Sequence, residues 1–272
     1  MERLQKALDL ARAERQRQRL NVVPAASDAG LPVGTHVASA TTPERVVSVD
    51  PSALRGHGIM PADSSGPAGN AFKMLRTQVL QRMRQHGWTT LAVVSPTPND
   101  GKTFTAINLA IAIAADTNHT ALLVDFDLRN PSVHQRFGIQ PEISVEQCLR
   151  GEASVANALI NPEGYPKLLL LPARERVMNS SDLLSSEAAR RLIRELKERQ
   201  PNRVVLFDLP PVLGADDALA FSPLVDAMLV VVGEDRTRRE DLLRCFEILR
   251  DIPVIGTVLN GSRTDASLAY AY

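Results

Sequence analysis

The chain has 272 residues, of which 44% are hydrophobic and 4% aromatic, so it can form one α/β domain with a mainly aliphatic core. Its 31 basic and 31 acidic residues balance, which argues against nucleic acid as a partner and against a membrane bound by bulk charge. Its longest apolar runs are too short to span a bilayer, and Cys148 and Cys245 stand in no disulfide or metal motif. We therefore expect a cytoplasmic protein.

The first 66 residues differ in composition from the rest, since no aromatic residue occurs before Phe72. Residues 1–19 carry apolar side chains at helical spacing among many charges, which predicts a short amphipathic N-terminal helix and not a signal peptide. Its narrow apolar stripe is more typical of a solvated helix than of a membrane anchor. Residues 20–66, with five prolines and five glycines, predict a linker or poorly ordered arm in which 45–61 can order against another segment.

From residue 67 to 265 the pattern alternates regularly between aliphatic strands and amphipathic helices. Such a pattern predicts one α/β domain, with a mostly parallel sheet covered by helices on both faces. The strands are expected at 89–95, 120–127, 167–173, 203–211, 227–233 and 253–260. The helices are expected at 68–85, 105–115, 132–136, 145–150, 180–200, 217–221 and 238–251.

The segment SPTPNDGKT, residues 95–103, follows the first of these strands and leads into an apolar helix. This order aims backbone N–H groups and the positive end of the helix at one point, which suits a polyphosphate. Lys102 is expected to reach the β- and γ-phosphates, and the Thr103 hydroxyl is expected to bind Mg²⁺. Asn99 and Asp100 stand where glycine is common, but both residue types tolerate the left-handed conformation. The alternative is a plain strand–turn–helix with a surface lysine.

Three carboxylates follow two other predicted strands. Asp125 and Asp127 end the strand after the loop helix, and Asp208 ends the strand at 203–211. Because ligands bind outside the carboxyl ends of parallel strands, all three acids are expected at the edge where the loop lies. Mg²⁺ prefers few carboxylates together with water and phosphate oxygens, so Thr103 and Asp208 are the expected metal partners. A single Asp after a strand is commonly a cap or turn residue.

The motifs SPTPNDGKT, LLVDFDLRNPSVHQRFG, NSSDLLSS, VVLFDLPPVLGADDA and GTVLNGSR together resemble those of the bacterial tyrosine kinases of capsule and exopolysaccharide export, over roughly residues 70–264. The resemblance implies a P-loop NTPase fold shared with the MinD/ParA group, ATP and Mg²⁺ as cofactors, and Asp125 and Asp127 beside the attacking hydroxyl. Asn260 resembles an adenine-reading residue, although Asn-Gly is also a good turn. The expected catalytic residues are Lys102, Asp125, Asp127 and Asp208. The expected nucleotide-binding residues are Asn99, Asp100, Gly101, Lys102, Thr103, Phe104 and Asn260.

The tail, residues 266–272, carries Tyr270 and Tyr272, two of the three tyrosines in the chain. We expect both to be phosphate acceptors, and the resemblance implies that the active site of a neighbouring protomer modifies them. The alternative is a chain end that happens to carry tyrosines. The family's oligomerisation pattern Glu-x-x-Arg-x-x-Arg corresponds here to Asn70, Lys73 and Arg76. Lysine cannot make the same bidentate contacts as arginine. The sequence therefore does not decide whether protomers assemble into a ring.

Other residues near the motifs have two interpretations. Arg129 can meet a phosphate or pair with an Asp, and His134 is interpreted as a helix residue and not as a catalytic base.

The resemblance also implies a membrane partner, the cytosolic tail of a polysaccharide co-polymerase, which would recruit the chain to the inner face of the plasma membrane. Two other functions stay open. One is a MinD/ParA-like positioning ATPase, a class that has lysine where this chain has Thr97. The other is a nucleotide-binding regulatory module with weak catalysis.

Overall fold

The computed structural model describes residues 45–198, 200 and 202–262. The expected N-terminal helix at 1–19, most of the arm that follows it, and the tail with Tyr270 and Tyr272 lie outside the described residues.

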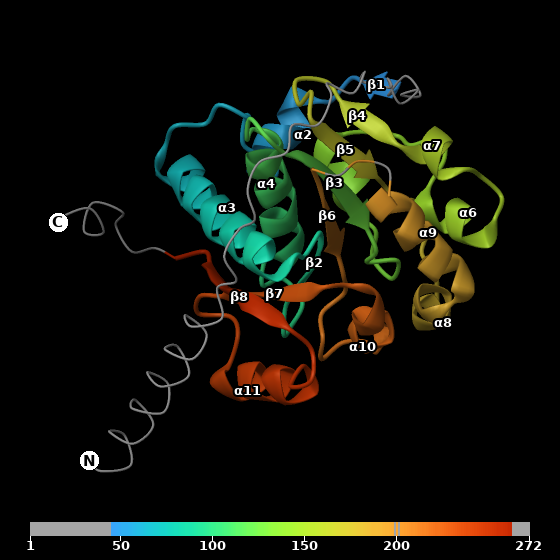
Figure 1. The fold of residues 1–272 in the computed structure, drawn as a ribbon. Coiled ribbons are helices and arrows are strands. Elements are labelled where there is room, and N and C mark those ends of the chain that lie inside the picture. The colour runs from blue at the N-terminus through green and yellow to red at the C-terminus, as the bar shows by residue number, and fades with distance from the viewer. Residues whose placement is uncertain (1–44, 199, 201, 263–272) are drawn as a thin grey trace, which may run out of the picture. The chain divides into compact units, whose positions relative to one another are not determined.

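Within the described residues, eight strands form one sheet in the order β1-β4-β5-β3-β6-β2-β7-β8 (Figure 1). Neighbouring strands are parallel except β4 and β5, which are antiparallel. The α/β class and the mostly parallel sheet are therefore confirmed. The strands are β1 (Arg45–Val47), β2 (Thr90–Val94), β3 (Thr120–Asp125), β4 (Ile160–Pro162), β5 (Leu168–Leu171), β6 (Arg203–Asp208), β7 (Ala227–Gly233) and β8 (Val254–Asn260).

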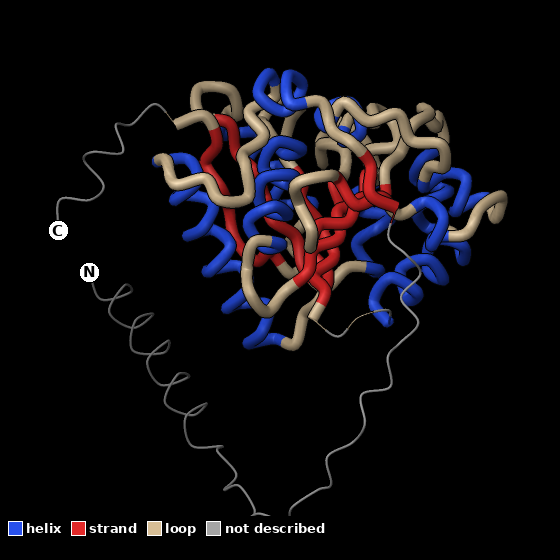
Figure 2. The backbone as a smooth tube through the Cα atoms, turned by 90° about the horizontal axis from the view of Figure 1, so that it is seen from above, coloured by secondary structure: helices blue, strands red, loops and turns tan. Residues whose placement is uncertain are grey.

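Helices cover both faces of this sheet because its central strands are apolar on both sides (Figure 2). In β2, Leu91 and Val93 join one core and Ala92 and Val94 join the other, as the alternation of side chains along a strand requires. Among the described residues, no helix has the length and apolarity needed to cross a membrane. The helices are α2 (Pro51–Gly56), α3 (Pro67–His86), α4 (Lys102–Ala114), α5 (Val133–Phe137), α6 (Val145–Arg150), α7 (Val155–Ala158), α8 (Ser180–Ser185), α9 (Glu187–Glu198), α10 (Asp217–Phe221) and α11 (Arg239–Ile248).

The six predicted strands are all present, but the helix predicted at 180–200 is two helices. Ser186 ends α8 with extended backbone angles, φ −68° and ψ 161°. Its hydroxyl accepts the Ala189 N–H at 3.1 Å, as an N-cap does at the start of a helix. The break follows from this local hydrogen bond, which helical periodicity alone does not reveal.

Part of the predicted linker, residues 45–66, belongs to the folded domain. β1 pairs with β4, and the Asp50 N–H donates to the Phe137 carbonyl of α5 at 3.2 Å. The Met60 N–H donates to Asn108 Oδ1 of α4 at 2.9 Å, and Tyr165 Oη donates to the Met60 carbonyl at 3.2 Å. The expectation that 45–61 orders against another segment is confirmed. The prediction of a linker up to residue 66 is wrong because widely spaced apolar residues, including Ile59, enter the core.

Candidate active site

The loop between β2 and α4 is held in a tight turn by its own side chains. Asn99 and Gly101 have left-handed backbones, with φ of +67° and +95°. Asp100 does not have one; it is buried, and its Oδ2 accepts both the backbone N–H and the hydroxyl of Thr97 at 2.9 Å. This closure orients the loop toward the N-terminus of α4, where backbone N–H groups can bind phosphate.

Asn260, at the end of β8, supports the same loop. Its Nδ2 donates to the Asp100 carbonyl at 3.0 Å. A Cβ placed on Gly101 would lie 1.9 Å from this Nδ2, so only glycine fits beneath Asn260. One of its two amide donors is thus already engaged by the loop.

Gly101→Ala is expected to weaken ATP binding more than tenfold and to lower thermal stability, because the new methyl group meets Asn260 at a left-handed position. Gly164→Ala is the matched control. Gly164 has φ of +86° but nothing within 4 Å of its virtual Cβ, so it shares the backbone strain without the clash. Equal ATP affinity in the two variants, measured by calorimetry, would show that the contact with Asn260 does not shape the loop.

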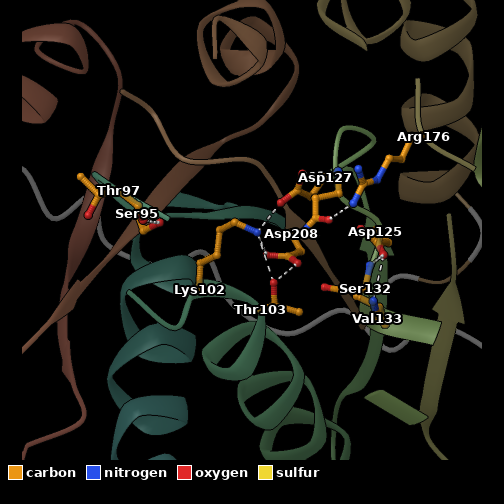
Figure 3. Close-up of polar contacts among 11 residues, drawn as sticks. Ser95, Thr97, Lys102, Thr103, Asp125, Asp127, Ser132, Val133, Arg176 and Asp208 are labelled. Atoms are coloured by element: carbon orange, nitrogen blue, oxygen red, sulfur yellow. Dashed lines mark hydrogen bonds and ion pairs between the residues drawn. The ribbon is translucent and has the colours of Figure 1, made fainter. Parts of the chain in front are cut away.

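Lys102 lies among the carboxylates at the strand ends (Figure 3). Its Nζ is 2.6 Å from Asp127 Oδ2, 3.5 Å from Asp208 Oδ1 and 3.2 Å from Thr103 Oγ1. Asp125 stands opposite Asp208 in the pairing of β3 with β6. The structure therefore brings all of the residues expected to be catalytic to one edge of the sheet.

Burial and mutual charge control the protonation of this cluster. Burial raises the pKa of Asp208, and burial together with the charge of Asp208 raises the pKa of Asp125 well above its usual range. Burial alone would lower the pKa of Lys102, but the charges of Asp208 and Asp127 outweigh it and raise that pKa. The lysine is thus a firmly protonated cation that faces several acids.

Thr103 and Asp208 offer the oxygen ligands that Mg²⁺ prefers. Thr103 Oγ1 donates to Asp208 Oδ2 at 2.6 Å. The other oxygen, Asp208 Oδ1, is buried and has no hydrogen-bond partner in the described part of the chain. No group of three or more His, Cys, Asp or Glu residues suited to a metal occurs there either. This donor set fits an ion that takes its remaining ligands from water and phosphate.

A cleft of about 480 Å³ opens beside the loop. Asp127 lies on its wall, whereas Asp125 does not; Asp125 Oδ2 instead accepts the N–H groups of Ser132 and Val133 at 3.0 Å (Figure 3). Asp125 therefore fixes the start of α5, and Asp127 is the acid that faces the cleft. The cleft is lined by Pro98, Asn99, Gly101, Lys102, Thr103, Phe104, Asp127, Arg129, Asn130, Ser132, Arg136, Pro210, Pro211, Gly214, Ala215, Arg236 and Asn260.

Phe104, expected to bind nucleotide, lines the cleft but also packs away from it. Its ring meets Phe72 edge to face, with centroids 5.8 Å apart, and lies against Gly58. It joins the loop helix α4 to α3 and to the segment after α2.

The structure shows the surroundings of Arg129 and His134, the two residues with open interpretations. Arg129 pairs with Asp217 at 2.8 Å and with Asp216 at 3.3 Å, as the ion-pair interpretation expects. His134 is buried in α5, and its burial lowers its pKa, so it is a neutral residue of that helix.

Sequence reasoning missed Arg136 and Arg236 as residues of the cleft. Arg236 follows β7 and donates to the Asn99 carbonyl at 2.9 Å, a contact across 137 positions that no local pattern marks. Arg136 lies in the predicted helix that follows Asp127, which is α5 in the structure. Its closeness in sequence to Asp127 was the signal that could have indicated a residue of the cleft.

Comparison with known proteins identifies the family of this chain. A family model described as an AAA domain matches residues 91–239, more than half of the chain. The chain is 26% identical over 203 residues to the tyrosine-protein kinase YwqD of Bacillus subtilis, a match that covers 74% of this chain and 84% of YwqD. It is 36% identical over 176 residues to the succinoglycan biosynthesis transport protein ExoP of Rhizobium meliloti, covering 62% of this chain but 22% of ExoP.

The solved kinase domain of the Escherichia coli tyrosine kinase ETK has the same fold, with a TM-score of 0.67 and 26% identity. That match covers 75% of this chain and 80% of the ETK domain. The region matched by the AAA domain model, residues 91–239, begins in β2 and includes the phosphate loop, Asp125, Asp127 and Asp208. The chain belongs to the AAA domain family, and it is similar in sequence and fold to bacterial tyrosine kinases.

Proposed function

We propose that this chain is an ATP-dependent protein-tyrosine autokinase whose folded domain begins near residue 45 and not at 67. The observation that carries the proposal is the contact of Lys102 with Asp127 and Asp208 at the start of α4. A protonated lysine, a hydroxyl and a cleft-facing carboxylate at one helix N-terminus are the groups that phosphoryl transfer requires.

Nucleotide binding in this proposal exchanges partners within the cluster. Phosphate oxygens take the place of Asp127 at Lys102, and backbone N–H groups of the loop add hydrogen bonds. Thr103 and Asp208 would hold Mg²⁺, which neutralises charge on the phosphates. Asp127 is then released from its ion pair and lies free on the cleft wall.

The proposed transfer proceeds by attack of the acceptor's phenolic oxygen on the γ-phosphorus. The bond from that phosphorus to the bridging oxygen breaks, and ADP leaves with the electron pair. The phenolic proton passes to Asp127, the acid on the cleft wall. Asp125 positions α5 through its two backbone hydrogen bonds. Little further covalent chemistry is needed, because positioning and charge supply most of the catalysis.

The proposed acceptors are Tyr270 and Tyr272 of a neighbouring protomer, and the proposed role is control of exopolysaccharide export. The name of ExoP supports that role for one relative, and the cytosolic tail of a membrane co-polymerase is the proposed activator and recruiter. In α3, Asn70 is exposed and Lys73 partly exposed, so that helix face is accessible to a second protomer.

The test is to incubate the full chain with ATP and Mg²⁺, with and without the co-polymerase tail, and to map phosphate by mass spectrometry. Phosphotyrosine on the tail is the expected result. Steady ATP hydrolysis without phosphotyrosine would instead favour a positioning ATPase, and ATP binding without turnover would favour a regulatory module.

Asp208→Asn is expected to raise the Mg²⁺ concentration needed for half-maximal activity about tenfold or more, because the lost charge faces the metal. ATP affinity in EDTA should change much less. Asp182→Asn, at an exposed carboxylate on α8, is the control and should change neither. If ATP affinity fell equally with and without Mg²⁺, the metal role of Asp208 would be wrong.

A further inference from the structure

Arg136 is a cation of the cleft that has no direct protein partner in the described residues. It is half-buried on α5 and lines the same cleft as Lys102 and Asp127. Its Nε is buried without a hydrogen-bond partner there. A buried donor left unpaired is costly, so its position indicates a ligand that is not part of these residues.

The other cleft arginines are already engaged. Arg129 pairs with Asp217 and Asp216, and Arg236 donates to the Asn99 carbonyl. Arg176, just outside the cleft lining, donates to Asn130 Oδ1 at 3.1 Å. Arg136 is therefore the guanidinium of this cleft that remains available for a bound anion among the residues described.

The position of Arg136 is fixed from both ends of α5. Asp125 accepts the N–H groups of Ser132 and Val133 at the start of the helix. At its end the Phe137 side chain is fully buried and the Phe137 carbonyl accepts the Asp50 N–H. A short helix held at both ends presents a side chain with little loss of backbone freedom on binding.

Arg136 and Lys102 line the same cleft from two different helices. Arg136 lies on α5, and Lys102 begins α4 at the end of the phosphate loop. Lys102 Nζ is 3.2 Å from Thr103 Oγ1, beside the loop. An anion that meets both Lys102 and Arg136 thus lies near the loop, where the terminal phosphate of a bound nucleotide would lie.

We propose that Arg136 binds the γ-phosphoryl group of ATP as a second cation beside Lys102 and stabilises it during transfer. This inference rests on the proposed kinase function. The planar guanidinium fork matches phosphate oxygens, and negative charge is spread over three equatorial oxygens in the transition state. The three nearby carboxylates repel the negative charge of the phosphate. An arginine at this position offsets that repulsion.

The test compares nucleotides that differ in the γ-phosphate. In Arg136→Gln, affinity for a non-hydrolysable ATP analogue with Mg²⁺ should fall about tenfold, while affinity for ADP with Mg²⁺ changes less than about twofold. The rate of phosphotyrosine formation should fall at least about a hundredfold. Arg136→Lys keeps the charge without the fork and should give an intermediate loss. Arg150→Gln, at the exposed end of α6, is the control and should match the wild type.

The outcomes separate this inference from the kinase proposal. Equal losses for ADP and the ATP analogue, or no loss for the analogue, would overturn the role of Arg136 and leave the kinase intact. Failure of the wild-type chain to bind either nucleotide would overturn both. A thermal melt of each variant identifies misfolding, and Arg136→Lys then decides the matter, because its side chain keeps the volume and charge of the site.

Discussion

Lys102→Met is expected to lower phosphotyrosine formation by about a thousandfold, to the limit of detection. Lys102 contacts both Asp127 and Asp208 and is the cation that phosphate oxygens would meet at the start of α4. Methionine has similar length and no charge, so the variant removes the electrostatic contribution with little change in packing. The measurement is the initial rate of phosphotyrosine formation at saturating ATP and Mg²⁺.

The fold of this variant should persist because its unpaired carboxylates can take up protons. Without Lys102, burial keeps the pKa values of Asp125 and Asp208 raised above their unfolded values. A carboxyl whose folded pKa is raised binds more protons in the folded state, so stability falls as pH rises through the range above the unfolded pKa. The melting temperature of Lys102→Met should therefore fall more steeply with pH than that of the wild type.

Lys197→Met serves as the matched control for Lys102→Met. Lys197 lies on α9 and pairs with Asp226 at 3.1 Å, outside the cleft. It should retain activity near that of the wild type. Normal phosphorylation by Lys102→Met would exclude the loop as the site of transfer.

Replacing both Tyr270 and Tyr272 with Phe should abolish autophosphorylation of that chain. Its intact cleft should still phosphorylate the tail of another chain in trans. The chain leaves β8 at Asn260, which itself contacts Asp100 of the loop. Twelve residues follow, with a reach of at most about 40 Å. Asn260 also lines the cleft, so this reach allows the tail to enter its own cleft or that of a neighbour, and transfer to a neighbour is the proposed route.

The decisive experiment mixes two chains, neither of which can label its own tail. One is Lys102→Met with an intact tail, and the other has a normal cleft with Tyr270→Phe and Tyr272→Phe. Label on the tail of the Lys102→Met chain, at a rate that rises with protein concentration, is the expected result. If label formed only when tail and active site shared one chain, at a rate independent of concentration, the transfer would be intramolecular.

Phosphorylation of the tail should also weaken its binding in the cleft. Each phosphate adds close to two negative charges, which the carboxylates at the cleft would repel. Because weaker binding of the tail should loosen the assembly, sedimentation is used to compare the oligomer size of phosphorylated and dephosphorylated protein. A smaller oligomer after phosphorylation is expected, and an unchanged or larger one would contradict the charge argument.

The sequence by itself determined the fold class and the location of the site. Its aliphatic strands and amphipathic helices are local patterns, and both require burial on two faces of a parallel sheet. Because the carboxyl ends of such strands meet at one edge, the positions of Lys102, Asp125, Asp127 and Asp208 along the chain were enough to predict that they converge.

Only the tertiary structure decided how the side chains divide their roles. Asp125 and Asp127 are two positions apart, yet one anchors α5 and the other pairs with Lys102 at the cleft. Asn260 reaches Asp100 across 160 positions. The docking of β1 and α2 likewise depends on distant partners. A three-residue strand is too short to show a hydrophobic period, so the sequence pattern does not reveal β1. Contacts between residues so far apart follow from how the elements pack, and no local pattern in the sequence encodes them.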